Sequence, residues 1–195
     1  MEFRPGQHLH LGVAGSMDMR EYSIYSGIHD DYIEVLIKEI EGGLVSRQLR
    51  KLEPGDNLAV EGPFGFFVID DEFGSAGHCF VATGTGIAPF RCISRSFSKL
   101  SFHILHGIRY FSERYDFDEY DQDRYHPCVS RDHVSSNGAN SGAYGGRVTD
   151  YLTNAGIDSE LRYFLCGNCD MIYEVFGLLR SHDIPADQIA TEVYF

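Results

Sequence analysis

The sequence predicts two domains: an antiparallel β-barrel domain over residues 1–74 and an α/β domain with a parallel sheet over residues 77–195. Three observations lead to this fold class. Polar and apolar residues alternate in short runs over the first third of the chain. Apolar runs then alternate with stretches of helical spacing, as in parallel sheets covered by helices. The change falls at "GSAG", residues 74–77.

The first domain is expected to consist of short antiparallel strands. The stretches "GQHLHLGV" from Gly6 and "DDYIEVLIKEI" from Asp30 alternate polar and apolar residues, which predicts two strands. "PGD" at residues 54–56 predicts a turn, followed by a strand over residues 58–61 that ends at Gly62-Pro63. A helix over residues 46–52 would cap this small barrel.

The second domain is expected to alternate strands and helices. Buried strands are predicted at "HCFVAT", "SFHILHG", "HPCVSRD", "LRYFLCG" and "QIATEVYF", and helices over residues 89–100, 147–155 and 170–181. Residues 112–124 are expected to form a solvated acidic segment, and residues 135–146 a glycine- and serine-rich loop. Ligands bind at the carboxyl ends of parallel strands, so we expect four residues to meet at one crevice: Gly84, Arg109, Arg131 and Gly167.

Composition excludes several classes of protein. The chain has 195 residues and a net charge of −13, which argues against nucleic-acid binding, because that depends on clusters of Lys and Arg. No apolar run approaches the ~20 residues that span a bilayer. The start "MEFRPGQHLHLG" lacks the pattern of a secretory signal, and five scattered cysteines are too few for a disulfide framework. A cytoplasmic location is therefore expected.

The stretch "FVATGTGIAPF", residues 80–90, breaks an apolar run with two glycines and resumes it at Pro89. Glycines permit a tight strand-to-helix turn, and proline suits a first helical turn, so a purely structural explanation is open. Such a turn also presents bare N–H groups at a helix start, which favours a phosphate. The stretch alone does not decide between the two, because the third glycine of the usual dinucleotide motif is absent.

Six motifs occur in the order of one known family and together span nearly the whole chain. They are "REYS", "GGLVS", "GPFG", "GTGIAP", "CGN" and "EVYF". In this order they resemble the motifs of the ferredoxin–NADP reductase family. The resemblance implies an FAD-binding barrel followed by a Rossmann-like NADP-binding domain. It also implies a flavoenzyme that transfers hydride between NADPH and FAD, and single electrons to or from ferredoxin or flavodoxin.

The resemblance also assigns a flavin site. It implies that Arg20 pairs with the FAD pyrophosphate, that Tyr22 packs against the isoalloxazine, and that Ser23 lies near the flavin N5. A guanidinium donates paired, charged hydrogen bonds to phosphate, and a hydroxyl both donates and accepts. Backbone N–H groups at a helix start would bind the pyrophosphate as well, and they belong to Gly43, Leu44, Val45 and Ser46.

The nicotinamide nucleotide is expected to be NADPH. The strand "FHILHGIR" ends on Arg109, where NAD-binding folds normally carry Asp or Glu. The resemblance adds Arg131 and Arg147 near the same phosphate. It places Cys166 and Glu192 beside the nicotinamide and Tyr194 against the flavin, so the expected catalytic residues are these three and Ser23. The other expected nucleotide contacts are Thr83, Gly84, Thr85, Gly86, Pro89, Gly167 and Asn168.

The flavin domain is expected to be shortened at its N-terminus. Family members generally carry further strands before the segment that begins here at Phe3. An incomplete barrel leaves open how tightly FAD binds, and it would expose a strand edge that favours self-association.

The electron-transfer partner is expected to be a separate chain, ferredoxin or flavodoxin, because no iron–sulfur cysteine run occurs here. Arg47, Arg50 and Lys51 could dock an acidic partner, although a solvated helix face is the favoured explanation of these three charges. Two alternatives remain. One is the reductase component of an oxygenase or a flavin reductase, and the other is a non-catalytic nucleotide-binding subunit.

No bound metal is expected. The "CGNC" stretch, residues 166–169, has no second ligand pair that would complete a zinc site, and a redox dithiol is the weaker interpretation. Histidines two or three residues apart, His8 with His10 and His103 with His106, lie on predicted strands. We expect them to be surface or hydrogen-bonded histidines.

Overall fold

The computed structural model describes residues 1–69, 77–134 and 142–194. The chain forms two compact units, Met1–Asp71 with Ala88–Ser98, and Glu72–Ile87 with Lys99–Phe195. The predicted boundary at residues 74–77 lies almost wholly outside the described residues, so the limits 1–74 and 77–195 stay a prediction. We describe each unit by itself.

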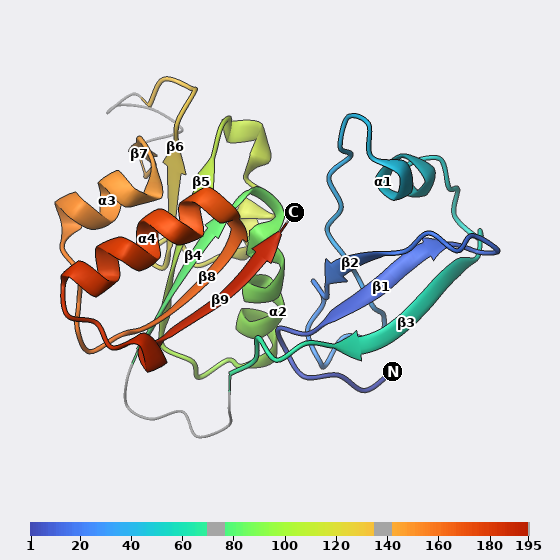
Figure 1. Cartoon of the computed structure of the whole chain (residues 1–195), viewed down its shortest axis with the longest axis horizontal. Coiled ribbons are helices and arrows are strands. Elements are labelled where there is room, and N and C mark those ends of the chain that lie inside the picture. The colour runs from blue at the N-terminus through green and yellow to red at the C-terminus, as the bar shows by residue number, and fades with distance from the viewer. Residues whose placement is uncertain (70–76, 135–141, 195) are drawn as a thin grey trace. The chain divides into compact units, whose positions relative to one another are not determined.

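The N-terminal unit is built on an antiparallel three-stranded sheet in the order β2-β1-β3 (Figure 1). Its strands are β1 (His8–Val13), β2 (Arg20–Ser23) and β3 (Leu58–Phe64). Among the described residues these three strands do not close into a barrel. Because β1 is bonded on both sides, its alternate residues define two faces: Leu9 and Leu11 are buried, while His8 and His10 lie on the opposite face.

Two helices belong to this unit, α1 (Leu44–Leu49) and α2 (Ala88–Ser96). Cys92 of α2 packs in the same core as Leu9, Leu11 and Ile24. The predicted helices 46–52 and 89–100 are confirmed in kind, although both begin and end earlier than expected. The helix over residues 89–100 was expected in the second domain, whereas α2 belongs to the N-terminal unit.

Residues 30–40 form no strand, so the strand predicted from "DDYIEVLIKEI" is wrong. Their only ladder contact in the described residues is a single bridge between Ile24 and Val35. Side chains of α2 hold this segment instead. Arg91 donates to Glu34 Oε2 at 3.0 Å and to the Tyr25 carbonyl at 3.0 Å, and Arg95 pairs with Asp30 at 2.8 Å. Alternation of side chains is insufficient for a strand where the backbone has no neighbouring strand to bond.

The prediction that Gly62-Pro63 ends a strand is also wrong, because β3 continues to Phe64. Pro63 has no N–H to donate, but β3 is an edge strand of this sheet, where a proline is tolerated. The register shifts between His8 and His10, where Phe64 and Glu61 are their respective partners.

The C-terminal unit contains a six-stranded parallel sheet in the order β7-β6-β5-β4-β8-β9. Its strands are β4 (His78–Thr83), β5 (Phe102–Ile108), β6 (Tyr125–Val129), β7 (Tyr144–Gly145), β8 (Arg162–Asn168) and β9 (Ile189–Tyr194). The five predicted strands are confirmed, with β6 starting one residue early. β7 was not predicted and lies at the end of the predicted loop 135–146, of which residues 135–141 fall outside the described part of the chain.

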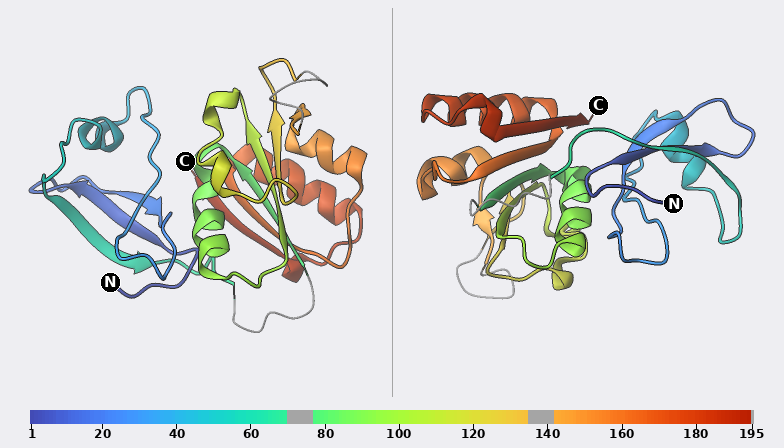
Figure 2. Two further views of the ribbon diagram at one scale, coloured as in Figure 1. Left: turned by 180° about the vertical axis from the view of Figure 1, so that it is seen from behind. Right: turned by 90° about the horizontal axis from the view of Figure 1, so that it is seen from below.

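Two helices, α3 (Val148–Ala155) and α4 (Cys169–Ser181), lie side by side over one face of this sheet (Figures 1 and 2). Val81, Leu105 and Leu165 of the sheet pack with Leu152 and Val175 of the helices. Both helices were predicted, to within one residue at their starts. The burial of apolar side chains between these helices and the sheet stabilises the fold in which the strand ends are aligned.

The acidic segment over residues 112–124 is not simply solvated. It forms two short 3₁₀ helices, Phe111–Glu113 and Phe117–Glu119, and its aromatic side chains pack against β6. The ring of Tyr120 stacks on that of Tyr125 at 4.9 Å, and Phe117 meets the same ring at 5.6 Å. Among the described residues, no helix is both long and apolar enough to cross a membrane.

Candidate functional site

The glycine-rich turn after β4 presents backbone rather than side chains at the edge of the sheet. Residues 84–87 form a 3₁₀ turn between β4 and α2. Gly84 has φ = 53°, a conformation that L side chains rarely adopt. The predicted Pro89 is the second residue of α2, where its missing N–H costs nothing, and it belongs to the N-terminal unit.

Two glycines let the ends of β4 and β8 touch through their backbones. A Cβ built on Gly86 would lie 2.7 Å from the carbonyl carbon of Cys166 and 2.8 Å from the Cα of Gly167. Gly167 itself has φ = 127°, and a Cβ there would meet Thr83. The Asn168 N–H donates to Thr83 Oγ1 at 2.9 Å. The structure therefore brings together the predicted residues Thr83, Gly86, Gly167 and Asn168.

A buried histidine that was not predicted as a site residue, His106, forms a hydrogen bond with the turn at residues 84–87. His106 Nε2 lies 2.8 Å from the carbonyl oxygen of Gly84, and His106 Nδ1 lies 2.6 Å from the hydroxyl of Tyr125. A carbonyl can only accept, so Nε2 carries the proton and Nδ1 accepts from Tyr125. Burial lowers the pKa of His106 to about 4, so the ring is neutral at pH 7. The signal in the sequence was a histidine inside an apolar strand.

The pairing of β8 with β9 places four predicted residues together. Cys166 is opposite Glu192 and Asn168 is opposite Tyr194 in the register. The Cys166 thiol is fully buried and lies 3.9 Å from Glu192 Oε2. Burial, with a smaller contribution from the Glu192 carboxylate, raises the pKa of this thiol well above its usual value, and a hydrogen bond with Tyr194 opposes the rise. The thiol is therefore protonated at neutral pH.

Three predicted arginines follow adjacent strand ends. Arg109 comes after β5, Arg131 after β6 and Arg147 directly before α3, and all three are exposed. The Arg131 N–H donates to the Arg109 carbonyl at 3.0 Å, and the Gly146 N–H donates to the Val129 carbonyl at 2.9 Å. These bonds place the three backbones along one edge of the sheet, next to the glycine turn.

Cys169 is exposed at the start of α4, whereas the other four cysteines are buried, and all five are free thiols. Burial raises the pKa of Cys79 to about 12 and that of Cys92 to about 11.

We expect a thiol reagent to modify one cysteine quickly in the native protein and five in denaturant, because the reacting species is an accessible thiolate. A Cys169→Ser variant should show no fast thiol, and a second fast thiol would contradict the burial described here.

In the N-terminal unit, the register of β2 separates the predicted flavin residues by face. Arg20 pairs with Leu11 and Tyr22 with Leu9, so both share one face, and Ser23 pairs with His8 on the other. The Tyr22 ring is half-buried against Leu9 and its neighbours, and its pKa is raised by burial and lowered to a smaller extent by Arg20. Ser23 is buried, so its side chain does not share the surface of Arg20 and Tyr22.

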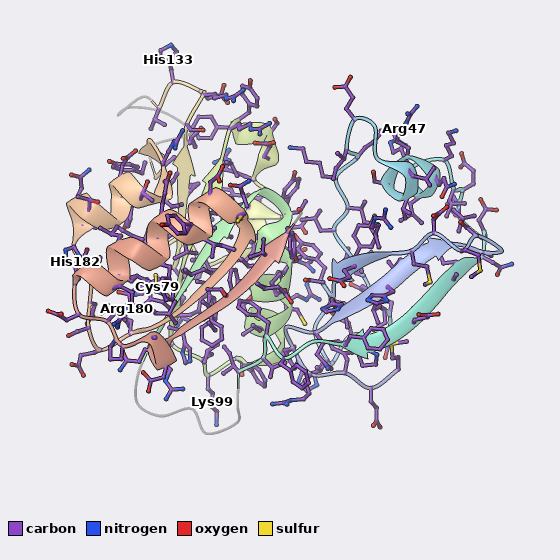
Figure 3. The ribbon with its side chains drawn as sticks, viewed as in Figure 1. Arg47, Cys79, Lys99, His133, Arg180 and His182 are labelled. Atoms are coloured by element: carbon purple, nitrogen blue, oxygen red, sulfur yellow. The ribbon has the colours of Figure 1, made fainter. Side chains whose placement is uncertain are left out.

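The predicted pyrophosphate loop forms a turn that leads into α1. Gly43 precedes the helix, Leu44 starts it, and Val45 and Ser46 are buried. Ser46 Oγ accepts from the Ile40 N–H at 3.2 Å, and the Gly43 N–H donates to the Ile40 carbonyl at 2.9 Å. The serine hydroxyl thus closes the turn. Arg47 projects from α1 (Figure 3) and lies 4.0 Å from Glu39, which offsets part of its charge.

Two family descriptions match the chain, one over its N-terminal third and one over most of the remainder. "Oxidoreductase FAD-binding domain" matches residues 1–69, and "Oxidoreductase NAD-binding domain" matches residues 80–175. The ferredoxin–NADP reductase B of Sorangium cellulosum is 31% identical, over 98% of this chain and 85% of its own length.

Other relatives are longer. The toluate 1,2-dioxygenase electron transfer component of Pseudomonas putida is 28% identical, over 96% of this chain and 57% of its own length. The chain thus spans less than two thirds of that relative. A crystal structure of an Amycolatopsis cytochrome P450 reductase has a TM-score of 0.85 at 22% identity, over 99% of this chain and 61% of that one, so the two share a fold.

Proposed function

The chain belongs to the ferredoxin–NADP reductase family, and from this premise we propose that it is a flavoenzyme that binds FAD and NADPH and exchanges electrons with a separate protein. One observation carries the proposal most strongly. The backbones at Gly86 and Cys166 approach so closely that no side chain fits between them, directly beside the buried Cys166 thiol, Glu192 and Tyr194. It sets the backbone of the glycine turn against that of β8 at the carboxyl ends of the strands, where nucleotides bind to parallel sheets.

NADPH would bind along the carboxyl ends of the parallel strands. The turn at residues 84–87 would offer N–H groups to the pyrophosphate, and His106 would hold that turn in place through Gly84. Arg109, with Arg131 and Arg147 along the same edge, would bind the 2′-phosphate. Guanidinium groups suit this role because they give paired, charged hydrogen bonds to phosphate oxygens.

FAD would bind on the face of β2 that carries Arg20 and Tyr22. The observation that fits this group is a half-buried phenol beside an exposed guanidinium, which offers a flat apolar surface next to a positive charge. When bound, FAD supplies two-electron exchange with the nicotinamide and one-electron exchange with the partner. The roles of Ser23, of Gly43 to Ser46 and of Tyr194 toward the flavin stay predictions from the motifs.

Cys166, Glu192 and Tyr194 would line the nicotinamide position. The Cys166 Sγ keeps its proton, which it can donate to Glu192, so the residue is an uncharged group rather than a nucleophile. Glu192, held in register by β8, sets a carboxylate beside it and can accept a hydrogen bond. Together they orient a ring and exclude water from it.

We expect the purified chain, supplied with FAD, to be yellow and to be bleached faster by NADPH than by NADH.

We also expect Arg109→Ser to raise the KM for NADPH about tenfold or more, because a hydrogen bond to a charged group contributes about 1.5–3 kcal/mol. The KM for NADH should stay within about twofold, because NADH lacks the 2′-phosphate. Steady-state reduction of a dye acceptor measures both.

Arg162→Ser is the matched control. Arg162 is also exposed, but it is the first residue of β8, whereas Arg109 follows the last residue of β5, so the two lie at opposite ends of the parallel strands. It should leave both KM values unchanged. Equal changes for NADPH and NADH in Arg109→Ser would contradict the 2′-phosphate role. A colourless chain that cannot be reconstituted with FAD would favour the non-catalytic nucleotide-binding subunit instead.

A second candidate is the reductase component of an oxygenase. It is favoured by the names of several relatives, which are electron transfer or reductase components of dioxygenases and monooxygenases. Rates of electron delivery to ferredoxin, flavodoxin and free flavin would distinguish the candidates. The docking patch at Arg47, Arg50 and Lys51, self-association through a sheet edge and the cytoplasmic location stay predictions.

A further inference from the structure

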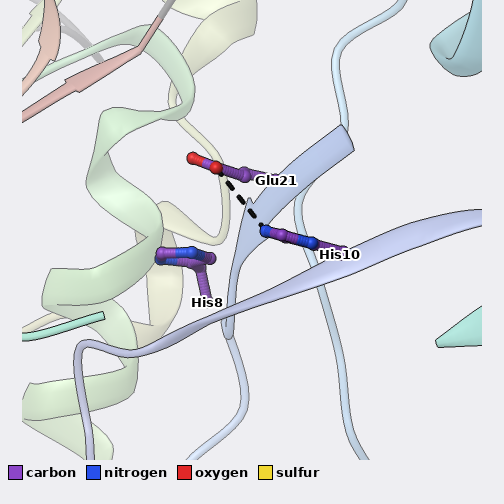
Figure 4. Close-up of side chains that lie close together, drawn as sticks. All are labelled: His8, His10 and Glu21. Carbon is purple, nitrogen blue, oxygen red and sulfur yellow. Dashed lines mark ion pairs between the residues drawn. The ribbon is translucent and has the colours of Figure 1, made fainter. Parts of the chain in front are cut away.

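Two histidines and a glutamate meet on the face of the N-terminal sheet that lies opposite Tyr22. His8 and His10 are two residues apart on β1, so their side chains share a face, and Glu21 of β2 is directly opposite His10. His10 Nε2 lies 3.5 Å from Glu21 Oε1 (Figure 4). One ligand atom from each of the three residues lies within 4.8 Å of the others. Within the part of the chain that the structure describes, this is the only such group of three.

The backbone positions of these residues are set by the sheet. β1 is the central strand and is bonded to both β2 and β3, so neither histidine is on a loop or at an edge. The two imidazole rings are nearly parallel, with an interplanar angle of 16° and centroids 5.8 Å apart. Phe64 of β3 packs against the His10 ring at 4.7 Å and limits its motion. Ligands on a rigid sheet need only rotate their side chains to close on an ion.

The ligand atoms of His8, His10 and Glu21 determine which metal ions the site can bind. Two imidazole nitrogens and one carboxylate oxygen suit Zn²⁺ and neighbouring transition ions, whereas Mg²⁺ and Ca²⁺ prefer oxygen donors alone. Three protein ligands leave a fourth position for water. Glu61 of β3, whose Oε2 is 4.0 Å from His10 Nδ1, adds a second carboxylate that would balance a divalent charge.

The site is accessible yet partly shielded. Both histidines are half-buried and Glu21 is exposed, so an ion can enter from solvent. Partial burial lowers the pKa of His8, although Glu21 raises it, and the neutral imidazole is the form that binds metal.

We propose that His8, His10 and Glu21 form a binding site for a divalent transition-metal ion, of which Zn²⁺ is the probe of choice. The site lies on the other face of β2 from Arg20 and Tyr22, and on the same face as Ser23, which pairs with His8. Metal binding is measured without FAD or NADPH, so its failure and a failure of the proposed function are distinguishable. The site departs from the expectation of surface or hydrogen-bonded histidines with no bound metal, since the carboxylate that completes it comes from a different strand.

Metal binding to the whole chain tests the proposal. The protein is stripped with a chelator, dialysed, and titrated with ZnCl₂ at pH 7.5 by calorimetry, and with CoCl₂ by visible absorption. A Cys169→Ser background removes the one exposed thiol, which would otherwise compete. We expect one Zn²⁺ per chain, a Co²⁺ spectrum with d–d bands, and a rise in the thermal midpoint on adding Zn²⁺.

His10→Ala and Glu21→Gln should each weaken Zn²⁺ binding at least about tenfold, since loss of even an outer-shell partner typically costs that much. Glu21→Gln keeps the shape of the side chain, so it remains informative if His10→Ala does not fold. The matched control is His103→Ala, an exposed histidine whose ring lies 5.7 Å from that of His126. His103→Ala should bind Zn²⁺ as the parent does. No binding by the parent, or an equal loss in the control, would overturn the proposal.

Discussion

Gly86→Ala is expected to abolish tight binding of NADP⁺. The new methyl group would lie 2.7 Å from the carbonyl carbon of Cys166, a backbone atom that cannot rotate away. The glycine turn must then move away from β8, and each hydrogen bond that it would lose to a charged phosphate contributes about 1.5–3 kcal/mol. We therefore expect the Kd for NADP⁺, measured by calorimetry, to rise about 100-fold or more, and the urea midpoint of unfolding to fall.

Gly177→Ala makes the same chemical change in the interior of α4, where no atom lies within 4 Å of the added carbon. This control should leave the Kd unchanged and raise stability by about 0.5–1 kcal/mol, because alanine has the higher helix propensity. If Gly86→Ala binds NADP⁺ as the parent does, the close approach of the two strand ends is not needed for the site.

Below pH 6.5 the protein is expected to lose stability through His106. Its pKa is about 4 in the folded chain against a usual 6.5, so the unfolded chain binds the proton more tightly. The stabilising contribution is complete above pH 6.5, declines as the pH falls, and is lost by pH 4. A shift of this size corresponds to about 3 kcal/mol in the free energy of unfolding. Urea titrations at pH 7.5, 5.5 and 4.5 measure the decline.

His106→Gln isolates this contribution from that of other histidines. A glutamine can donate to the Gly84 carbonyl and accept from the Tyr125 hydroxyl, as the neutral ring does, but it does not titrate. Burial also lowers the pKa of His78 and His126, so part of the pH dependence should persist. The variant should be distinctly less sensitive to acid than the parent. An unchanged pH profile would show that His106 does not control acid stability.

Much of the candidate site could be predicted because its signals are local. The turn at residues 84–87, the "CGN" motif that ends on Asn168 and the arginines after β5 and β6 each depend on a few neighbouring residues, and the structure places them at one sheet edge. His106 and Tyr125 could not be predicted as partners, because they are 19 residues apart and only the pairing of β5 with β6 brings them together.

The two wrong strand predictions also arise because contacts with neighbouring elements, and not the local pattern, determine the structure. Residues 30–40 alternate like a strand, but no neighbouring strand bonds them beyond Val35 in the described chain, and contacts with α2 decide their path. Conversely, Pro63 signals the end of a strand, but β3 continues past it because that edge of the sheet needs no donor there. The local sequence pattern indicates which conformations a segment can adopt, and its contacts with neighbouring elements determine which one it adopts.

The sequence by itself determined the two-part fold class, the parallel strands and helices of the second unit, and the family, because periodicity, turn residues and motif order are properties of the chain alone. Only the tertiary structure decided that His106 supports the glycine turn, that the Cys166 thiol is fully buried, and that Glu21 joins His8 and His10. Strand order and register bring these residues together. Both depend on contacts between residues distant in sequence, which no local pattern encodes.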